Sequence, residues 1–317
     1  MIPPSEPLTT VPAKLPVVGR FAPSPTGPLH VGSLVAALGS YIMARREEGR
    51  WLLRMEDLDL PRVIPRCADD ILRSLEVLGF WWDGAVMYQS RRGDFYENAM
   101  ERLKRAGLMY PCSCSRAEIA RIASAPHGEE GVVYPGTCRG GLAVGKVERA
   151  WRVRVVDEVI GFDDGVMGVY SQNLAGLCGD FVVKRADGPY SYHLAVVVDD
   201  ADCGVNQVVR GGDLLSSTTR QIYLQRLLGY STPAYAHLPL VCNSDGTKLS
   251  KRDHAVSIGA GVDLRKEGGR LLLAALRFLG QSPPHTLDHA PCNEIFSWAF
   301  AMFDPGSIPR ESGPIPT

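Results

Sequence analysis

The first third of the chain alternates between short apolar runs and longer segments with helical spacing. Residues 17–21 form an apolar run typical of a strand, and a turn rich in proline and glycine leads from it into residues 32–46, whose spacing and composition are helical. Residues 51–56 have the pattern of the next strand. A strand, a glycine-bearing loop and the N-terminus of a helix, in this order, form the phosphate-binding arrangement of doubly wound α/β folds.

The pattern changes at Pro111, where cysteine-bearing loops and glycine-rich segments replace the regular alternation until about residue 145. Strand and helix patterns then return, beginning with an alternating strand at 150–156. The tail from Asp304 is rich in proline and glycine, and we expect it to be frayed. The other expected elements are helices at 67–78, 94–106, 213–228, 263–279 and 293–303, strands at 180–184 and 238–241, and strand and helix material at 192–200.

These elements predict an α/β protein with a Rossmann-like doubly wound parallel sheet, a cysteine-bearing α+β insert and a short C-terminal helical remnant. We expect five parts, namely a disordered leader (1–16), a first Rossmann-like half (17–110), the insert (111–190), a second Rossmann-like half (191–257) and the C-terminal remnant (258–317).

Composition narrows the class of protein. No apolar run approaches the roughly 18 residues of a membrane span, and the N-terminus lacks the apolar stretch of a secretory signal. Without such a signal, the eight cysteines favour reduced thiols or a metal site over disulfides, and we expect a cytoplasmic monomer. The 34 Lys and Arg against 35 Asp and Glu give a net charge of -1. This balance of charges does not indicate that the protein binds nucleic acid, although a neutral protein can still have a local basic face.

Two short segments far apart in the chain predict an ATP site. The first is His30-Val-Gly32-Ser33 at the start of the expected helix, and the second contains Lys248 and Lys251. A helix N-terminus binds phosphates through backbone N–H groups, an imidazole can stabilise charge developing on phosphate, and loop lysines can neutralise pyrophosphate. Alone, the histidine would more often be a helix cap and the lysine pair a solvated turn. Together they predict activation of a carboxylate at the α-phosphate of ATP.

Four further stretches, with these two, make residues 19–257 similar to the catalytic domain of glutamyl-tRNA synthetases, which are class I aminoacyl-tRNA synthetases. The stretches are Arg20-Phe-Ala-Pro-Ser24, Arg54-Met-Glu-Asp-Leu-Asp59, Tyr192-His-Leu-Ala195 and Val209-Arg-Gly211. The chain resembles more closely a shortened branch, the glutamyl-queuosine tRNA(Asp) synthetases. That branch attaches glutamate to the queuosine base in the anticodon of tRNA-Asp.

The resemblance implies a glutamate site, and the residue types suit a ligand with two carboxylates and an ammonium group. Guanidinium groups bind carboxylates in a bidentate manner, and Glu56 can face the ammonium group. Any single arginine could instead form a surface salt bridge worth roughly 0–1 kcal/mol. Glutamyl-tRNA synthetases have asparagine at the position of Val196, whereas the queuosine-specific branch has valine there. The implied glutamate-binding residues are Arg20, Ala22, Ser24, Glu56, Tyr192 and Arg210.

The cysteine cluster is a candidate zinc site. Cys112, Cys114 and Cys138 lie in a glycine-containing stretch, and thiolates are common zinc ligands. The Cys-x-Cys spacing is less common than Cys-x2-Cys, so three buried, inert thiols are an equal alternative. The resemblance implies one structural Zn2+ held by Cys112, Cys114, Tyr134 and Cys138, with His127 as a rival to the tyrosine.

For the whole chain, the resemblance implies activation of L-glutamate by ATP and Mg2+ without tRNA, followed by transfer to tRNA-Asp that bears queuosine. Only about 60 residues follow Ser257, too few to read an anticodon from the far end of a tRNA, which favours an acceptor in the anticodon loop itself. Three alternatives stay open, namely a truncated glutamyl-tRNA synthetase charging tRNA-Glu or tRNA-Gln, a non-catalytic tRNA-binding module and a generic nucleotidyltransferase. Val196 and the short C-terminus argue against the first. The intact motif residues argue against the second, and the two-arginine pocket argues against the third.

Overall fold

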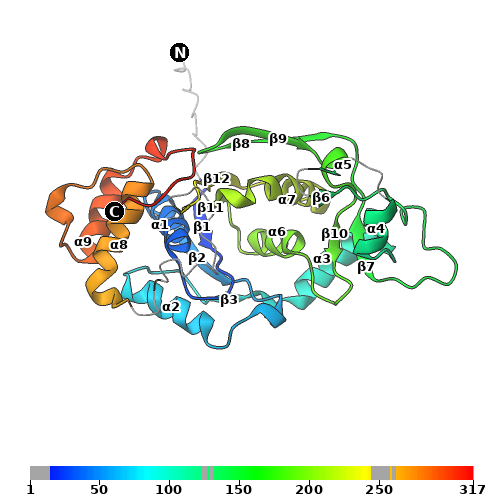
Figure 1. Cartoon of the computed structure of the whole chain (residues 1–317), viewed down its shortest axis with the longest axis horizontal. Coiled ribbons are helices and arrows are strands. Elements are labelled where there is room, and N and C mark those ends of the chain that lie inside the picture. Colours follow the sequence, from blue (N-terminus) through cyan, green and yellow to red (C-terminus); the bar gives the residue numbers. More distant parts are fainter. Residues whose placement is uncertain (1–14, 123–126, 129–130, 244–257, 259–261, 317) are drawn as a thin grey trace, which may run out of the picture.

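The computed structural model describes residues 15–122, 127–128, 131–243, 258 and 262–316 (Figure 1). Almost all of the expected leader lies outside the described residues, and so do Lys248 and Lys251. Within the described part of the chain, no helix is long and apolar enough to cross a membrane.

Parallel strands form the centre of the molecule (Figure 1). These strands are β1 (Val18–Phe21), β2 (Arg50–Met55), β3 (Met87–Tyr88), β11 (Gln207–Gly211) and β12 (Ala234–Leu238). β2 pairs in parallel with β1 and β3, and β11 pairs in parallel with β12. The two groups of strands meet at Val18 and Asn206. The side-chain oxygen of Asn206 accepts a hydrogen bond from the Val18 N–H, and the backbone N–H of Asn206 donates to the Val18 carbonyl.

Alternation along the strands divides the interior into two cores, one on each face of the sheet. Val209 lies in one core and its neighbour Val208 in the other, as successive side chains of a strand must. The first core holds α1 (Val31–Arg45), α2 (Cys67–Val77), α8 (Leu264–Phe278) and α9 (Cys292–Met302). The second holds α3 (Gly93–Arg105), α6 (Tyr192–Asp202) and α7 (Leu215–Leu228). Helices on both faces confirm the predicted doubly wound α/β fold.

Gly39 allows α1 to pack closely on the sheet. A Cβ atom added to Gly39 would lie 2.6 Å from Cδ1 of Leu238 in β12, so a larger residue would force the Leu238 side chain or the helix to shift. Since α1 begins at the first ATP motif, this contact helps to fix the motif over the strand ends.

The cysteine-bearing insert extends from the sheet at the right of Figure 1. Its antiparallel sheet has the order β10-β7-β4, formed by β4 (Met109–Cys112), β7 (Ala150–Val153) and β10 (Val182–Lys184). The smaller elements are α4 (Arg116–Ile122), α5 (Leu174–Leu177), β5 (His127–Gly128) and β6 (Gly131–Val132).

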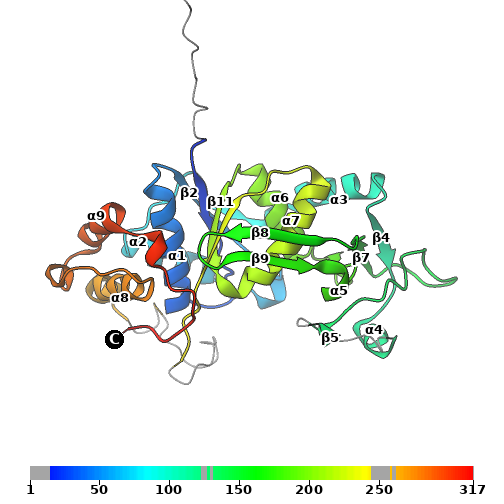
Figure 2. The same cartoon turned by 90° about the horizontal axis from the view of Figure 1, so that it is seen from above.

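A long antiparallel hairpin between β7 and β10 was not predicted from the sequence. It consists of β8 (Val159–Asp164) and β9 (Gly168–Asn173), and it runs along the molecule in Figure 2. β8 joins the edge of β12 in parallel, where Asp164 pairs with Tyr235. The hairpin therefore brings a residue of the insert region to the sheet of the second Rossmann-like half.

The C-terminal segment packs against the first core, and its end is ordered. α8 and α9 contribute buried side chains to the core around α1. The expectation of a frayed tail from Asp304 is wrong, because Ile308 is buried and Gly313 bonds to the backbone of Leu240 and Cys242. The expected strand and helix material at 192–200 is a single helix, α6.

Candidate active site

A cleft of about 550 Å³ lies between the N-terminus of α1 and the carboxyl ends of β1, β11 and β12. The carboxyl ends of parallel strands are where doubly wound folds bind ligands. Gly211 and Asp213 line the cleft across from the first motif. The predicted residues that line it are Ala22, Ser24, His30, Gly32 and Ser33.

His30 is the N-cap of α1. Its backbone is extended, and its Nδ1 atom accepts a hydrogen bond from the Ser33 N–H at 3.3 Å. With Nδ1 as acceptor, a neutral imidazole carries its proton on Nε2. The capping role that sequence reasoning offered as an alternative is thus compatible with phosphate binding, because the cap fixes the ring and leaves Nε2 a donor.

Beside the cleft lies a buried network of charges that contains two of the predicted glutamate-binding residues, Arg20 and Glu56. The Arg20 Nε lies 3.3 Å from Asp200, and Arg54 lies 2.5 Å from Asp200 and 3.2 Å from Glu56. Burial raises the pKa of Glu56, although the neighbouring Arg54 opposes this effect. Burial would also raise the pKa of Asp200, but the charges of Arg20 and Arg54 bring it below its usual value.

Tyr192 and Arg210, two further predicted glutamate-binding residues, lie near this network. The Arg210 Nη1 lies 3.3 Å from the Tyr192 hydroxyl. The charges that act on this hydroxyl come from Arg210, Glu56, Arg20 and Arg54, while its burial raises the tyrosine pKa. The structure therefore places Arg20 and Glu56 in one ion-paired network, with the contact between Tyr192 and Arg210 within reach of its charges. Val196 lies one helical turn further along α6 and is buried.

Buried hydrogen bonds to neighbouring side chains fix the position of the Arg210 guanidinium. Its Nε donates to the Nε2 of His237 at 3.0 Å, and its Nη2 lies 2.8 Å from both Thr218 and Gln221. The Nδ1 of the same histidine lies 2.6 Å from Asp164, the last residue of β8. If Nε2 accepts from the arginine, Nδ1 carries the proton and donates it to the carboxylate.

Asp164 is itself fixed by the backbone around it. Its carboxylate accepts N–H bonds from Val166, Met167 and His237, at 3.1, 2.9 and 2.9 Å. Burial alone would raise its pKa, but the bonds from His237 and the backbone lower it to about 2. The carboxylate thus stays ionised and holds the histidine in the tautomer that accepts from Arg210.

We expect His237 to make the folded chain less stable as pH falls below about 6.5. Burial lowers the pKa of His237, and the charge of Arg210 lowers it further. The hydrogen bond that His237 donates to Asp164 raises this pKa but does not outweigh them. The unfolded chain has the ordinary histidine pKa of about 6.5, so in the window below that value it binds more protons. The free energy of unfolding therefore decreases as pH falls, by at most about 1.4 kcal/mol per pH unit for this group.

Urea unfolding of the unaltered chain and of His237→Gln, at several values between about pH 7.5 and pH 5.5, measures this contribution. The variant should show the shallower dependence. Equal slopes in the two proteins would contradict the assignment of a neutral, buried histidine.

Sequence reasoning missed the residues that support the glutamate cluster. They are Arg54, Asp164, Asp199, Asp200, Thr218, Gln221 and His237. A signal existed for the two aspartates, because an acidic pair at the end of the apolar run of α6 is buried only with partners. The roles of Asp164 and His237 depend on the β8–β9 hairpin, which the alternation did not reveal.

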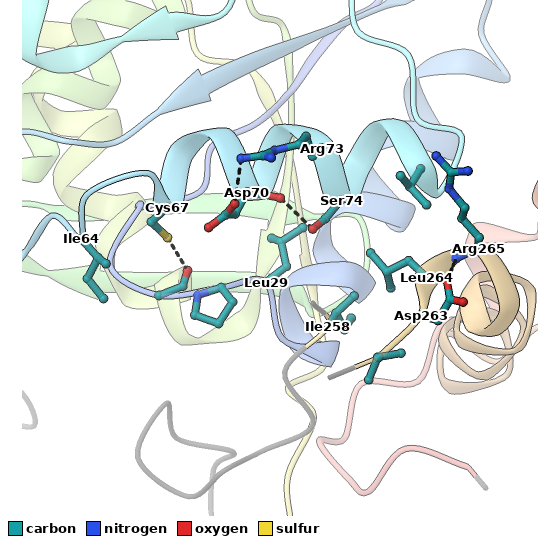
Figure 3. A pocket seen from close by; sticks show the side chains of 14 residues that line it. Leu29, Ile64, Cys67, Asp70, Arg73, Ser74, Ile258, Asp263, Leu264 and Arg265 are labelled. Carbon is teal, nitrogen blue, oxygen red and sulfur yellow. Dashed lines mark hydrogen bonds and ion pairs between the residues drawn. The ribbon is translucent and has the colours of Figure 1, made fainter. Parts of the chain in front are cut away.

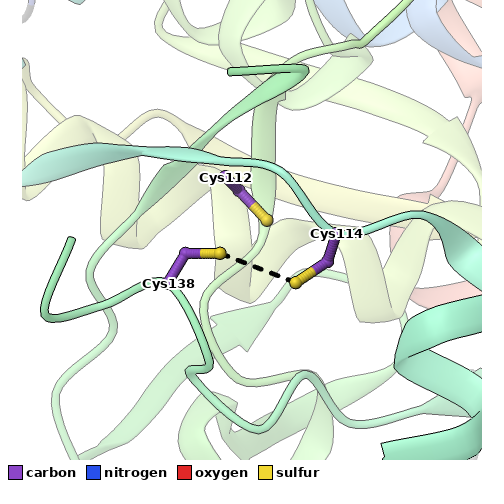
Figure 4. Close-up of side chains that lie close together, drawn as sticks. All are labelled: Cys112, Cys114 and Cys138. Atoms are coloured by element: carbon purple, nitrogen blue, oxygen red, sulfur yellow. Dashed lines mark hydrogen bonds between the residues drawn. The ribbon is translucent and has the colours of Figure 1, made fainter. Parts of the chain in front are cut away.

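The cysteine cluster has the geometry of a metal site (Figure 4). The Sγ atoms of Cys112, Cys114 and Cys138 lie within 4.8 Å of one another, and the last two are 3.6 Å apart. The Tyr134 hydroxyl lies 3.4 Å from Cys112 and 3.8 Å from Cys114. Thiolates about 2.3 Å from a tetrahedral zinc ion lie roughly 3.8 Å apart, so the cluster fits this ion. The side chain of His127 is outside the described part of the chain.

A second hollow of about 550 Å³ lies between α2 and the start of α8 (Figure 3). It shares Gly27, Pro28 and Leu29 with the cleft at the first motif. Arg73 on its wall is turned to Asp70 and pairs with it at 3.1 Å. None of the predicted site residues lines this hollow, and we assign no substrate to it.

Comparison with known proteins identifies the family. Residues 16–296 match the family model of tRNA synthetases class I (E and Q), catalytic domain. The chain is 63% identical to the glutamyl-Q tRNA(Asp) synthetase of Geobacter sulfurreducens over 94% of this chain and 96% of that protein. The chain belongs to the glutamyl-Q tRNA(Asp) synthetase family. The family member of Dechloromonas aromatica is 53% identical over 94% of this chain and 97% of that protein.

Solved structures place the glutamyl-Q tRNA(Asp) synthetase fold among the class I synthetases. A glutamate tRNA ligase from Elizabethkingia meningosepticum, crystallised in complex with its amino acid, superposes with a TM-score of 0.78 at 26% identity. The match covers 95% of this chain and 67% of that one. The glutamate-tRNA synthetase of Elizabethkingia anophelis gives 0.77 at 26% identity, over 95% and 68% of the two chains. The resemblance stated from the motifs is confirmed, and the names of the relatives agree with the queuosine-specific branch.

Proposed function

We propose that this chain activates L-glutamate with ATP and transfers the glutamyl group to queuosine in the anticodon of tRNA-Asp. The observation that carries the proposal is that the buried charge cluster directly adjoins the cleft. Arg20 belongs to the cluster, and Ala22, just beyond the end of β1, lines the cleft. In the same way Arg210 belongs to the cluster, and the next residue, Gly211 at the end of β11, lines the cleft. A carboxylate held by the cluster therefore has a neighbouring space for a nucleotide.

The cluster suits glutamate because it offers separate partners for each charged group. Arg210, oriented by His237, Thr218 and Gln221, presents its Nη1 beside Tyr192 to a carboxylate. The Nε of Arg20 donates to Asp200. In our assignment its two terminal nitrogens therefore donate to a carboxylate of the bound glutamate. Glu56 pairs with the ammonium group, which offsets the cost of burying its carboxylate.

The cleft suits ATP. The Nε2 of His30 donates to a phosphate oxygen, and Gly32 allows the nucleotide to approach the backbone closely. Mg2+ enters with ATP as part of the substrate and bridges phosphate oxygens. In this assignment Lys248 and Lys251, which lie outside the described residues, neutralise the leaving pyrophosphate.

The reaction then has two steps. The α-carboxylate oxygen of glutamate attacks the α-phosphorus of ATP, the bond to the bridging oxygen breaks, and pyrophosphate leaves as glutamyl-adenylate forms. A hydroxyl on the cyclopentene ring of queuosine attacks the glutamyl carbonyl, loses its proton and forms the ester, and AMP leaves. The side chains act by positioning the reactants and by stabilising charge, and no covalent enzyme intermediate is required. Such a reaction takes place where tRNA and ATP are found, which in bacteria is the cytoplasm.

Glutamate-dependent exchange of labelled pyrophosphate into ATP, measured without tRNA, tests the first step. We expect exchange with L-glutamate, because the partners of Arg210 already hold it in place in the absence of RNA. Exchange that requires added tRNA, or that is supported equally by L-glutamine, would contradict the proposed first step.

We also propose that Cys112, Cys114, Tyr134 and Cys138 hold one structural Zn2+ ion. The convergence of three sulfurs and a phenol oxygen supports this ligand set, and a closed four-ligand site stabilises the fold rather than taking part in chemistry. In the insert, the ion would join β4 to the loop that carries Cys138.

Cys138→Ser should lower the zinc content of protein purified without chelator from about one ion per chain to a small fraction of that value. The insert should then unfold at lower temperature, whereas Cys242→Ser, outside the cluster, should keep both properties. Unaltered protein that contains no zinc by elemental analysis would rule out the site.

A further inference from the structure

We propose that a concavity on the insert binds a phosphodiester group of the RNA that accepts glutamate, an inference that rests on the proposed function. We call it the arginine pocket and define it by Arg116, Arg149, Arg152 and Arg185. It has a volume of about 400 Å³ and lies between the start of α4 and strands β7 and β10. Figure 1 shows these elements at one end of the molecule.

The charge of the arginine pocket is strongly one-sided, although the whole chain has a net charge of -1. Among the residues that line it, four are arginines and one, Asp187, is acidic. Asp187 is already paired with Arg185 at 2.6 Å. Arg116 and Arg149 are exposed and form no ion pair with any residue that the structure describes. The charge of Arg116 also acts on Asp187, so the lining sets one carboxylate against four guanidinium groups.

The floor of the arginine pocket is rigid. Arg152 is 8% exposed, its Nη1 donates to the Asp180 carbonyl at 2.7 Å, and its guanidinium lies 3.7 Å from the centre of the Tyr134 ring. Its Nε also donates to the Sγ of Cys112 at 3.3 Å, so these contacts hold the guanidinium in one position. A buried guanidinium under two exposed ones suits a compact anion with several acceptor oxygens, such as a phosphodiester.

The arginine pocket reaches the loop that follows β2. The Nη1 of Arg185 lies 3.5 Å from the carboxylate of Asp59, three residues after Glu56 in the loop that follows β2. In our proposal, RNA held in the pocket continues from this loop toward the glutamate site. Phosphate contacts position a nucleic acid without reading its sequence, so this contact would place the acceptor base over the activated carboxylate.

The test compares the double variant Arg116→Glu/Arg149→Glu with the unaltered chain. We expect the KM for queuosine-bearing tRNA-Asp in glutamate transfer to rise by about tenfold or more, as charged hydrogen bonds are lost. The dependence of log KM on log salt should become shallower by about 0.7–0.9 for each phosphate contact removed. Glutamate-dependent pyrophosphate exchange without RNA should be unchanged. Arg270→Glu, on α8 at the other end of the molecule, is the matched control and should change neither reaction.

Each outcome is decisive. An unchanged KM in the double variant overturns the arginine pocket alone, and so does a loss of RNA-free pyrophosphate exchange, because the arginines would then act on activation. Failure of the unaltered chain to transfer glutamate to any tRNA overturns the proposed function and the pocket with it. If the double variant contains less zinc than the unaltered chain, its insert is damaged. The same two reactions are then measured with Arg116→Gln/Arg149→Gln, and the same outcomes decide.

Discussion

Replacing Arg210 by alanine should reduce kcat/KM for glutamate in pyrophosphate exchange by roughly 30- to 5,000-fold. The range corresponds to about 2–5 kcal/mol, the usual cost of removing one member of a buried, hydrogen-bonded charge pair with a ligand. In the proposed site the carboxylate of glutamate would lose its partner, and His237 would lose the donor that its Nε2 accepts from. The KM for ATP should change much less, because the nucleotide cleft does not include Arg210.

Two further variants sharpen this expectation. Arg210→Lys keeps the charge but cannot satisfy His237, Thr218 and Gln221 together, so it should recover only part of the activity. Arg226→Ala removes an exposed arginine from α7, paired with Glu158 at 3.8 Å, and should have no effect. Undiminished glutamate-dependent exchange by Arg210→Ala would refute the assignment of this residue to the glutamate site.

Replacing Asp200 by alanine should destabilise the folded chain by about 3–5 kcal/mol, the typical cost of breaking a buried ion pair from one side. Asp200 is 4% exposed and lies within 3.3 Å of Arg20 and 2.5 Å of Arg54. Among the described residues, Arg20 has no other ion-pair partner, so the variant leaves this buried guanidinium without its direct partner. Such a loss is a large part of the roughly 5–15 kcal/mol stability of a typical domain.

Denaturant unfolding measures this loss as a lower midpoint at unchanged slope. Asp70→Ala is the control, because its ion pair with Arg73 is exposed and should contribute about 0–1 kcal/mol. A shift for Asp200→Ala as small as that of the control would mean that the buried network adds little to stability.

Much of the fold could be predicted from the sequence because its helices and strands have local signals. The elements around the first motif depend on an apolar strand, a turn of proline and glycine and a helix, and all three signals are local. The β8–β9 hairpin has no comparable signal, since Val159 and Val169 are exposed and the apolar alternation is broken. The ordered tail was missed because its order comes from pairing with Leu240 and Cys242, distant in sequence.

The candidate site divides in the same way. Arg20, Glu56, Tyr192 and Arg210 were named through a family resemblance. The structure links the first two through Asp200 and Arg54 and pairs the last two directly. The residues that orient them come from elements whose contacts are not local. The partnership of Asp164 with His237 requires the parallel register between β8 and β12, which no sequence pattern specified.

The central claim is the identity of the acceptor. Its most direct test is transfer of labelled glutamate to purified tRNA-Asp that carries queuosine, with the same tRNA lacking queuosine and tRNA-Glu as parallel acceptors. We predict stable labelling of the queuosine-bearing tRNA-Asp only. Labelling of tRNA-Glu alone, or equal labelling of tRNA-Asp with and without queuosine, would contradict this account.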